Sequence, residues 1–302
     1  EIEEPLKAEK AFNKQIEFAK EKGMKQYEEY LAYYWYYKAL GNSCEFIDYF
    51  LKYLKYLPPD EFANINAVKQ FCFVLMHTGF PKEAKKYANE IYRQNKNHYN
   101  YIVRLLMSDW YNLRAESVVE YAEETLLLDS INFDFIYYLY PALIQLEDYK
   151  KAGLYMPKLA TFRHSFMDSS HITAAKGLYY LKTGNTETGT EIIKKEIKRL
   201  EDLIKSNSVN AYNGLTQIDV AGCYSVLGEK DQAFKYLNML KTMNTYPKVI
   251  GARHYIQLKE SVFFKDIREK PEFKRILQEV EDTYFQKHQC VEEVLRKYGE
   301  IE

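Results

Sequence analysis

The segment from His164 to His171 carries the residue types closest to a metal site in this sequence. His164, Asp168 and His171 are spaced four and three residues apart. On one continuous helix the two histidines would lie about 10 Å apart, because each residue adds about 1.5 Å along the axis. That separation is too long for two ligands of one zinc ion, whose bonds to nitrogen are about 2 Å. We therefore expect a loop and a helix start here, and no metal or other cofactor.

Other candidate catalytic residues lack partners close in the sequence. His77 and Asp109 have no neighbour that would complete a nucleophile and base pair. The sequence contains no glycine-rich phosphate loop, no HExxH zinc helix and no GxSxG turn. We therefore predict that the protein is not an enzyme. Carboxylates from separate helices could still meet in a concave surface, so a helical enzyme remains the least favoured alternative.

The four cysteines are widely separated and form no CxxC pair. They are Cys44, Cys72, Cys223 and Cys290. Neither their spacing nor their density is typical of a small disulfide-stabilised domain. We therefore predict buried thiols that pack as small apolar residues.

Composition and charge favour a helical protein without an electrostatic partner. The chain has 302 residues, with 29 Tyr and 17 Phe against only 12 Gly and 8 Pro, which predicts long elements and few turns. A formal net charge of −1 provides no attraction to nucleic acid, and no apolar run reaches the length of a membrane span. The chain begins with Glu1, so we expect either a processed N-terminus or a further domain upstream. The compartment, cytoplasmic or periplasmic, stays open.

Turn residues recur along the chain at regular intervals. Gly41 and Gly79 are 38 residues apart, and Gly184 and Gly228 are 44 residues apart. Glu147 occupies the corresponding place between them, and a degenerate turn is expected at 112–114. Each position follows an apolar stretch with helical spacing, which predicts a glycine-type turn between two helices. Intervals in this range indicate a solenoid of helix pairs.

Residues 217–240 show the repeat most plainly. Ala221 and Ala233 lie where two helices would cross closely, and Tyr224 and Leu237 surround them, with Gly228 between the helices. This pattern resembles the tetratricopeptide repeat family, and the resemblance extends over most of the chain. It implies an all-α protein, a right-handed α–α superhelix of about six to seven helix pairs over residues 1–260.

The C-terminal part differs from the repeats. Residues 262–277, VFFKDIREKPEFKRIL, resemble an element that often follows tetratricopeptide arrays in multidomain bacterial regulators. We therefore predict that residues 261–302 are capping helices packed on the last repeat. Pro271 should open a helix that continues to Tyr284, and a final helix should run from Gln286 to Tyr298.

The resemblance also implies a binding groove on the concave side, lined by exposed residues of the first helix of each pair. The family's groove positions correspond to Leu31, Trp35, Lys38, Lys69, Phe73, Met76, His77, Tyr137, Gln145, Leu178, Lys182, Ile218 and Ser225. Trp35, Phe73 and Tyr137 are large apolar groups at places that core packing does not require. Such residues are typical anchors of a peptide-binding surface.

The leading hypothesis is therefore a scaffold that binds a protein or peptide segment, as a sensing or assembly module of a larger bacterial protein. An alternative is a regulatory domain of a transcriptional or signalling protein that changes its superhelical curvature when a peptide binds. A change in the compactness of the chain when a peptide binds would favour the regulatory domain.

Overall fold

The computed structural model describes residues 3–40, 42–58, 63–94, 115–128, 133–160, 170–206, 215–242 and 252–302. Within these ranges the chain forms α-helices and one short 3-10 helix but no strand, so the all-α prediction is confirmed. Several predicted features lie outside the described residues. They are Gly41, the turn at 112–114, Asp109, His164 and Asp168.

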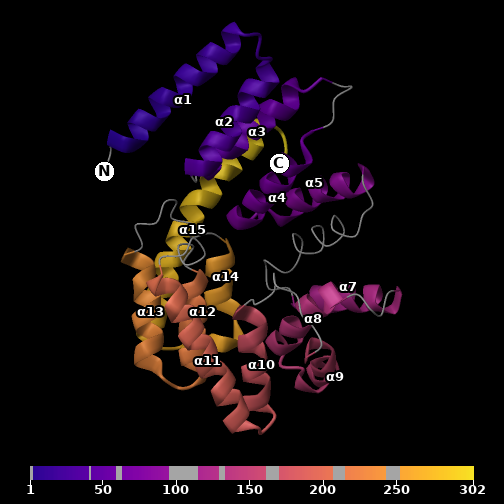
Figure 1. Cartoon of the computed structure of the whole chain (residues 1–302), viewed down its shortest axis with the longest axis vertical. Coiled ribbons are helices and arrows are strands. Elements are labelled where there is room, and N and C mark those ends of the chain that lie inside the picture. The colour runs from indigo at the N-terminus through magenta and orange to yellow at the C-terminus, as the bar shows by residue number, and fades with distance from the viewer. Residues whose placement is uncertain are drawn as a thin grey trace.

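The helices follow one another along the chain with short connections wherever the connection is described (Figure 1). In order they are α1 (Glu3–Glu21), α2 (Gln26–Leu40), α3 (Ser43–Tyr56), α4 (Ile65–Thr78), α5 (Pro81–Gln94), α7 (Ala115–Leu128), α8 (Phe133–Gln145), α9 (Tyr149–Ala160), α10 (Ser170–Lys182), α11 (Thr186–Lys205), α12 (Leu215–Val226), α13 (Lys230–Thr242), α14 (Ala252–Glu260), η3 (Val262–Phe264) and α15 (Pro271–Lys297).

Neighbouring helices pack in pairs, namely α2 with α3, α4 with α5, α8 with α9, α10 with α11, and α12 with α13. Turns of two or three residues join the members of each pair, which requires the two helices to run antiparallel. Pro58 follows the end of α3, and Pro81 opens α5. Pro81 fits there because N–H groups in the first turn of a helix have no acceptor within the helix, so the N–H that proline lacks is not needed.

The turn residues adopt the expected left-handed backbone. Gly79 has φ 93° and ψ 23°, and the N–H of Phe80 donates to the carbonyl of Leu75 at 2.8 Å, which closes the end of α4. Glu147 has φ 57° and is the only non-glycine residue with positive φ in the described part of the chain. Its place between α8 and α9 confirms that it substitutes for the glycine of the other turns.

Three larger groups of buried side chains form the interior. The N-terminal core lies between α2, α3, α4 and α5, where the rings of Phe50 and Phe71 stack at 4.1 Å. The middle core lies between α7, α8, α9 and α10, around Leu139 and Tyr140. The C-terminal core joins α11, α12, α13, α14 and the start of α15, around Ala221 and Leu237.

The last helix links two of these cores. α15 is continuous from Pro271 to Lys297, so the break predicted between Tyr284 and Gln286 is wrong. Its first half packs on α13 and α14, and its second half continues to α3 and α4 (Figure 1). The apolar spacing of the two halves stays in phase along one helix, which explains why no break is needed.

The C-terminal part has a buried apolar interface with the helices before it. Phe264, Ile267 and Phe273 are buried in the C-terminal core, and the rings of Phe264 and Phe273 lie 5.5 Å apart. The contact with the first helix pairs was not predicted, and it shows that this part does more than cover the last pair. The domain division at residue 260 itself stays a prediction.

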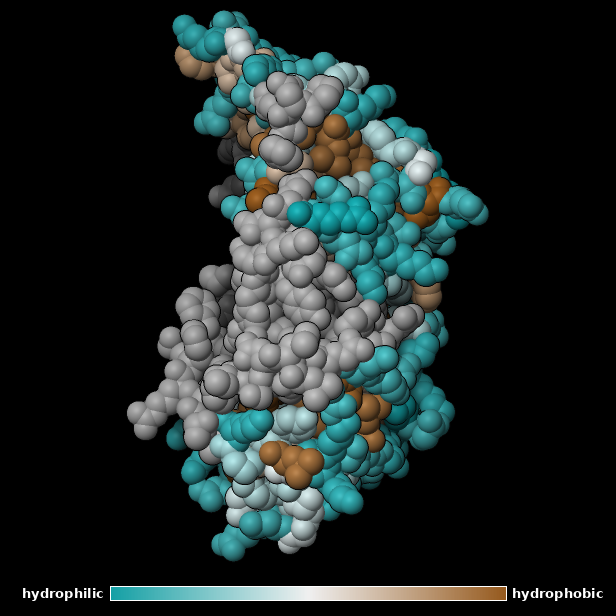
Figure 2. All heavy atoms as spheres, turned by 90° about the vertical axis from the view of Figure 1, so that its right-hand side faces the viewer, coloured by the Kyte–Doolittle hydropathy of each residue, from teal (hydrophilic) through white to brown (hydrophobic). Residues whose placement is uncertain are grey.

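Apolar side chains of the described residues form small separate groups among hydrophilic ones on the face shown in Figure 2. Among the described helices none combines the length and the apolar character that crossing a bilayer requires.

Candidate functional site

Four of the predicted groove residues lie inside the protein. Met76, Leu178, Ile218 and Ser225 are each at most 1% exposed. The prediction of exposed groove positions is therefore wrong for these four. α10 lies against α8, α9, α11 and α12, and α12 lies against α10, α11, α13, α14 and η3. Helices surrounded by so many neighbours bury even the faces that a regular open repeat leaves exposed.

Gln145 also has a different role from the predicted one. Its side-chain amide nitrogen donates to the carbonyl of Glu260 at 2.7 Å, and its side-chain oxygen accepts from the N–H of Val262 at 3.1 Å. These bonds tie the end of α8 to the connection between α14 and η3. Gln145 therefore positions the chain rather than offering its amide to a ligand.

The remaining predicted residues fall into two groups. Lys182 is exposed on α10. It lies far along the sequence from the other predicted groove residues that stay accessible. Lys38 and Tyr137 lie on α2 and α8, but their side chains are outside the described part of the structure. The residues that remain together are those of α2 and α4.

The two helices α2 and α4 meet at a buried hydrogen bond. The hydroxyl of Tyr34 donates to the carbonyl of Ala67 at 2.6 Å. Burial raises the pKa of Tyr34 far above its ordinary value, so this hydroxyl keeps its proton. The next residue of α2 is Trp35. Trp35 is 36% exposed, and its ring meets that of Tyr34 edge to face at 4.8 Å.

Lys69, Phe73 and His77 form a stripe along α4, because residues four apart share one face of a helix. All three are partly buried, and Phe73 packs with one side against the N-terminal core. Burial lowers the pKa of Lys69 below its usual range. With Leu31 and Trp35 of α2, these side chains make the candidate surface, which we call the α2–α4 surface.

The second half of α15 docks at the end of this stripe. His288 Nδ1 lies 2.7 Å from the carbonyl oxygen of Thr78, which can only accept, so Nδ1 carries the proton. The imidazole also stacks on Phe80 at 4.5 Å, nearly parallel. Tyr284 places its hydroxyl directly over Gly79, where a side chain would collide with it. The turn between α4 and α5 is therefore shaped to receive α15.

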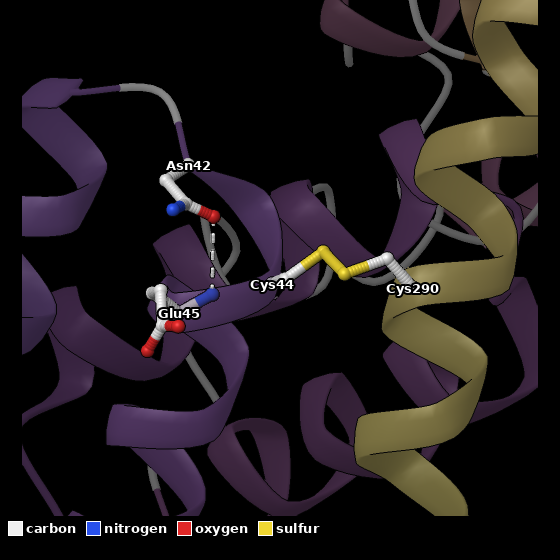
Figure 3. Close-up of a disulfide and its surroundings, with 4 residues drawn as sticks. All are labelled: Asn42, Cys44, Glu45 and Cys290. Atoms are coloured by element: carbon white, nitrogen blue, oxygen red, sulfur yellow. Dashed lines mark hydrogen bonds between the residues drawn. A yellow bond between two sulfur atoms is a disulfide. The ribbon is translucent and has the colours of Figure 1, made fainter.

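A disulfide joins α15 to α3, between Cys44 and Cys290 (Figure 3). The prediction of four free thiols is wrong for this pair and right for Cys72 and Cys223, which are buried and free. Cys72 stands within an apolar run, FCFVLM, whereas Cys44 and Cys290 stand in the mixed segments NSCEF and HQCVE. This difference in sequence context could have separated the paired cysteines from a buried free one. Which cysteines pair, however, depends on where α15 runs in the fold.

A buried carboxylate reinforces the same contact. Asp48 of α3 is 7% exposed and accepts hydrogen bonds from Lys297 at 2.7 Å and from the hydroxyl of Tyr298 at 3.0 Å. Lys52, one turn later on α3, lies 2.6 Å from its other oxygen. Burial by itself would raise the pKa of Asp48, but the hydrogen bonds from the two lysines outweigh it and lower the pKa.

We expect the substitution Asp48→Asn to lower the free energy of unfolding at pH 7 by about 1–2 kcal/mol, since charged hydrogen bonds are lost while both lysines can turn to water. Because the folded pKa is depressed, the carboxylate stabilises the protein fully above the unfolded value of 3.8 and loses its effect as the pH falls through the folded pKa. Urea unfolding at pH 7 and below pH 4 should show the two proteins converging in acid. Asp282→Asn, at an exposed site of α15, is the control; an equal effect there would contradict this role of Asp48.

Other acidic groups in the interior serve the packing of the last helix pairs. Glu196 is 2% exposed and accepts two hydrogen bonds from Arg199, at 3.0 and 2.6 Å. Glu201 accepts from the hydroxyls of Tyr224 and Tyr236, at 2.8 and 2.6 Å, which connects α11 with α12 and α13. In the described part of the chain no three His, Cys, Asp or Glu residues are grouped as a metal ion would require.

Neither a protein-family model nor a curated protein matches this sequence significantly.

Proposed function

We propose that the chain is a tetratricopeptide-like scaffold of helix pairs that binds a peptide segment of a protein partner on the α2–α4 surface. The chain would form a right-handed superhelix, with recognition by shape and apolar complementarity. The supporting observation is that the first helices of two successive pairs, α2 and α4, are fixed together and both present aromatic side chains on their accessible sides, namely Trp35 and Phe73.

The chemistry of this surface suits a peptide with large apolar side chains. Trp35 offers a ring that already packs against Tyr34, so little side-chain freedom is lost on binding. Phe73 is anchored on one side by the N-terminal core. Rigid aromatic groups of this kind account for most of the affinity in many protein interfaces.

A selection of random-sequence peptides displayed on phage, using the whole chain as the target, would test this function. Enriched peptides are synthesised, and their affinities are measured for the parent chain and for the variants Trp35→Ala and Phe73→Ala. We expect each substitution to weaken binding by about tenfold or more, as truncation of an aromatic anchor does.

The control variants remove exposed apolar side chains elsewhere. Phe18→Ala on α1 and Leu154→Ala on α9 truncate side chains that are 62% and 71% exposed. Peptides that bind the parent chain should bind these variants equally well. If Trp35→Ala and Phe73→Ala also leave every selected peptide's affinity unchanged, the α2–α4 surface is not the binding site.

A further inference from the structure

The proposed peptide binding does not rest on the Cys44–Cys290 disulfide. Its cysteines are 246 residues apart and lie on helices of different cores, α3 in the N-terminal core and α15, whose first half belongs to the C-terminal core. We propose that this disulfide is a redox-controlled clasp. When oxidised it holds the second half of α15, Lys287–Lys297, on α3 and α4, and reduction by a dithiol releases that half. This inference is independent of the peptide surface.

α15 has a weakly packed stretch where release can begin. Tyr284 is the last buried residue of its first half, and Val291 is the first buried residue of its second half. None of the six residues between them is fully buried, and Phe285 is 45% exposed. Besides the disulfide, this stretch contacts the first helix pairs through His288, which lies against Thr78 and Phe80. Segments with few buried apolar contacts open more readily than the rest of a protein. The two halves of α15 are therefore able to differ in how firmly they are held.

The disulfide is within reach of a reductant, whereas the other sulfurs are not. Cys44 and Cys290 are only partly buried, while Cys72 and Cys223 are 0% exposed. Burial also raises the pKa of Cys72 to about 12 and that of Cys223 well above its usual range, so neither forms the thiolate that exchange requires. Thiol exchange is thus confined to one pair, which can open and close without forming wrong disulfides.

The reaction is an ordinary thiol–disulfide exchange with a dithiol as the electron donor. A thiolate of the reductant attacks one sulfur of the Cys44–Cys290 bond, forms a mixed disulfide and displaces the other cysteine as a thiolate. The second thiol of the reductant then closes its own disulfide and displaces the first cysteine. Two electrons pass to the cystine, two cysteine thiols result after protonation, and the reductant becomes a cyclic disulfide.

Reduction leaves the second half of α15 held by a small set of contacts. Val291 and Leu295 are buried in the N-terminal core. At its end the exposed Lys297 donates to the buried Asp48 at 2.7 Å, and the exposed Lys86 pairs with Glu300 at 2.7 Å. The second of these is a surface ion pair, which adds little to stability. The covalent bond therefore makes a large difference to how often this half detaches.

The clasp is tested by hydrogen exchange of the full chain, with mass spectrometry, before and after treatment with dithiothreitol. We expect amides of Lys287–Lys297 to exchange about tenfold faster or more after reduction, a local opening, while those of Pro271–Tyr284 keep their rates. Removal of the reductant and reoxidation should restore the slow exchange. Alkylation of the folded reduced chain should label two cysteines, Cys44 and Cys290.

Single variants separate the clasp from general effects of the reductant. Cys44→Ser and Cys290→Ser should show the fast exchange without dithiothreitol and should not respond to it. Cys72→Ala, at a free cysteine, should still respond.

Three results would overturn the proposal. One is that two thiols are freed while the exchange of Lys287–Lys297 does not change, which would make the disulfide a passive cross-link. Another is that both halves of α15 exchange faster together, which would make it a general staple of the fold. The third is that Cys44 and Cys290 are found as free thiols in the untreated chain kept in air.

Discussion

Replacing Leu295 with alanine is expected to lower the free energy of unfolding by about 2–5 kcal/mol, the range found for buried leucines. Leu295 is 0% exposed and lies in the N-terminal core, although its helix begins in the C-terminal core. The substitution leaves a cavity where α15 meets α3 and α4. Urea denaturation of the oxidised chain gives the change in free energy.

The same substitution at an exposed site provides the control. Leu154 of α9 is 71% exposed, so Leu154→Ala should change stability by no more than about 0.5 kcal/mol. Hydrogen exchange shows where in the fold the destabilisation acts. Leu295→Ala should weaken the protection of amides in α3 and α4 more than that of amides in α12 and α13. Equal stabilities for the two alanine variants would show that the second half of α15 is not packed on the first helix pairs.

The substitution Gly79→Ala should cost about 2–4 kcal/mol for two separate reasons. An alanine at φ 93° pays about 1–2 kcal/mol for the left-handed backbone. Its Cβ would also lie 2.8 Å from His288 Nδ1 and closer still to the Tyr284 hydroxyl, and such overpacking costs about 1–3 kcal/mol. Tyr284 cannot simply turn away, because its ring is 9% exposed and stacks on Tyr255 at 5.4 Å.

Gly184 separates the two effects, since it has φ 95° but no atom within 4 Å of the position of a Cβ. Gly184→Ala should therefore show only the backbone cost of about 1–2 kcal/mol. Adding Tyr284→Phe to Gly79→Ala should recover part of the loss, because it removes the nearest colliding atom. Thermal and urea unfolding of the four proteins measure these differences. Equal costs at Gly79 and Gly184 would mean that α15 does not press on the turn.

Local features of the fold could be predicted from the sequence. Gly79 and Gly228 mark helix ends because few other residues tolerate a left-handed backbone, and Pro81 and Pro271 mark helix starts. Even Glu147 could be placed at a turn, because the apolar spacing on both sides required one. These signals act over a few residues, so they survive in a single sequence.

The contacts of α15 with α3 and α4 could not be predicted, because they join residues more than two hundred positions apart. Asp48 and Lys297 carry no mark of their pairing in the sequence. The candidate surface was predicted in part for a related reason. Phe73 and His77 lie on one stripe of α4, but Met76, displaced by about 60° around the helix from Phe73, faces the core. Only the neighbours of a helix decide which of its sides stays accessible.

The span of α15 between two cores also bears on how the chain is made. A simple helical solenoid can fold pair by pair as it leaves the ribosome, since each pair needs only its neighbour. Here the N-terminal core lacks Val291 and Leu295 until some two hundred further residues have followed Ala88. At about 5–20 residues per second this interval lasts roughly 10–40 seconds. During that time the apolar side chains of α3 and α4 that receive α15 remain uncovered, and transiently exposed apolar surface of this kind is prone to aggregation.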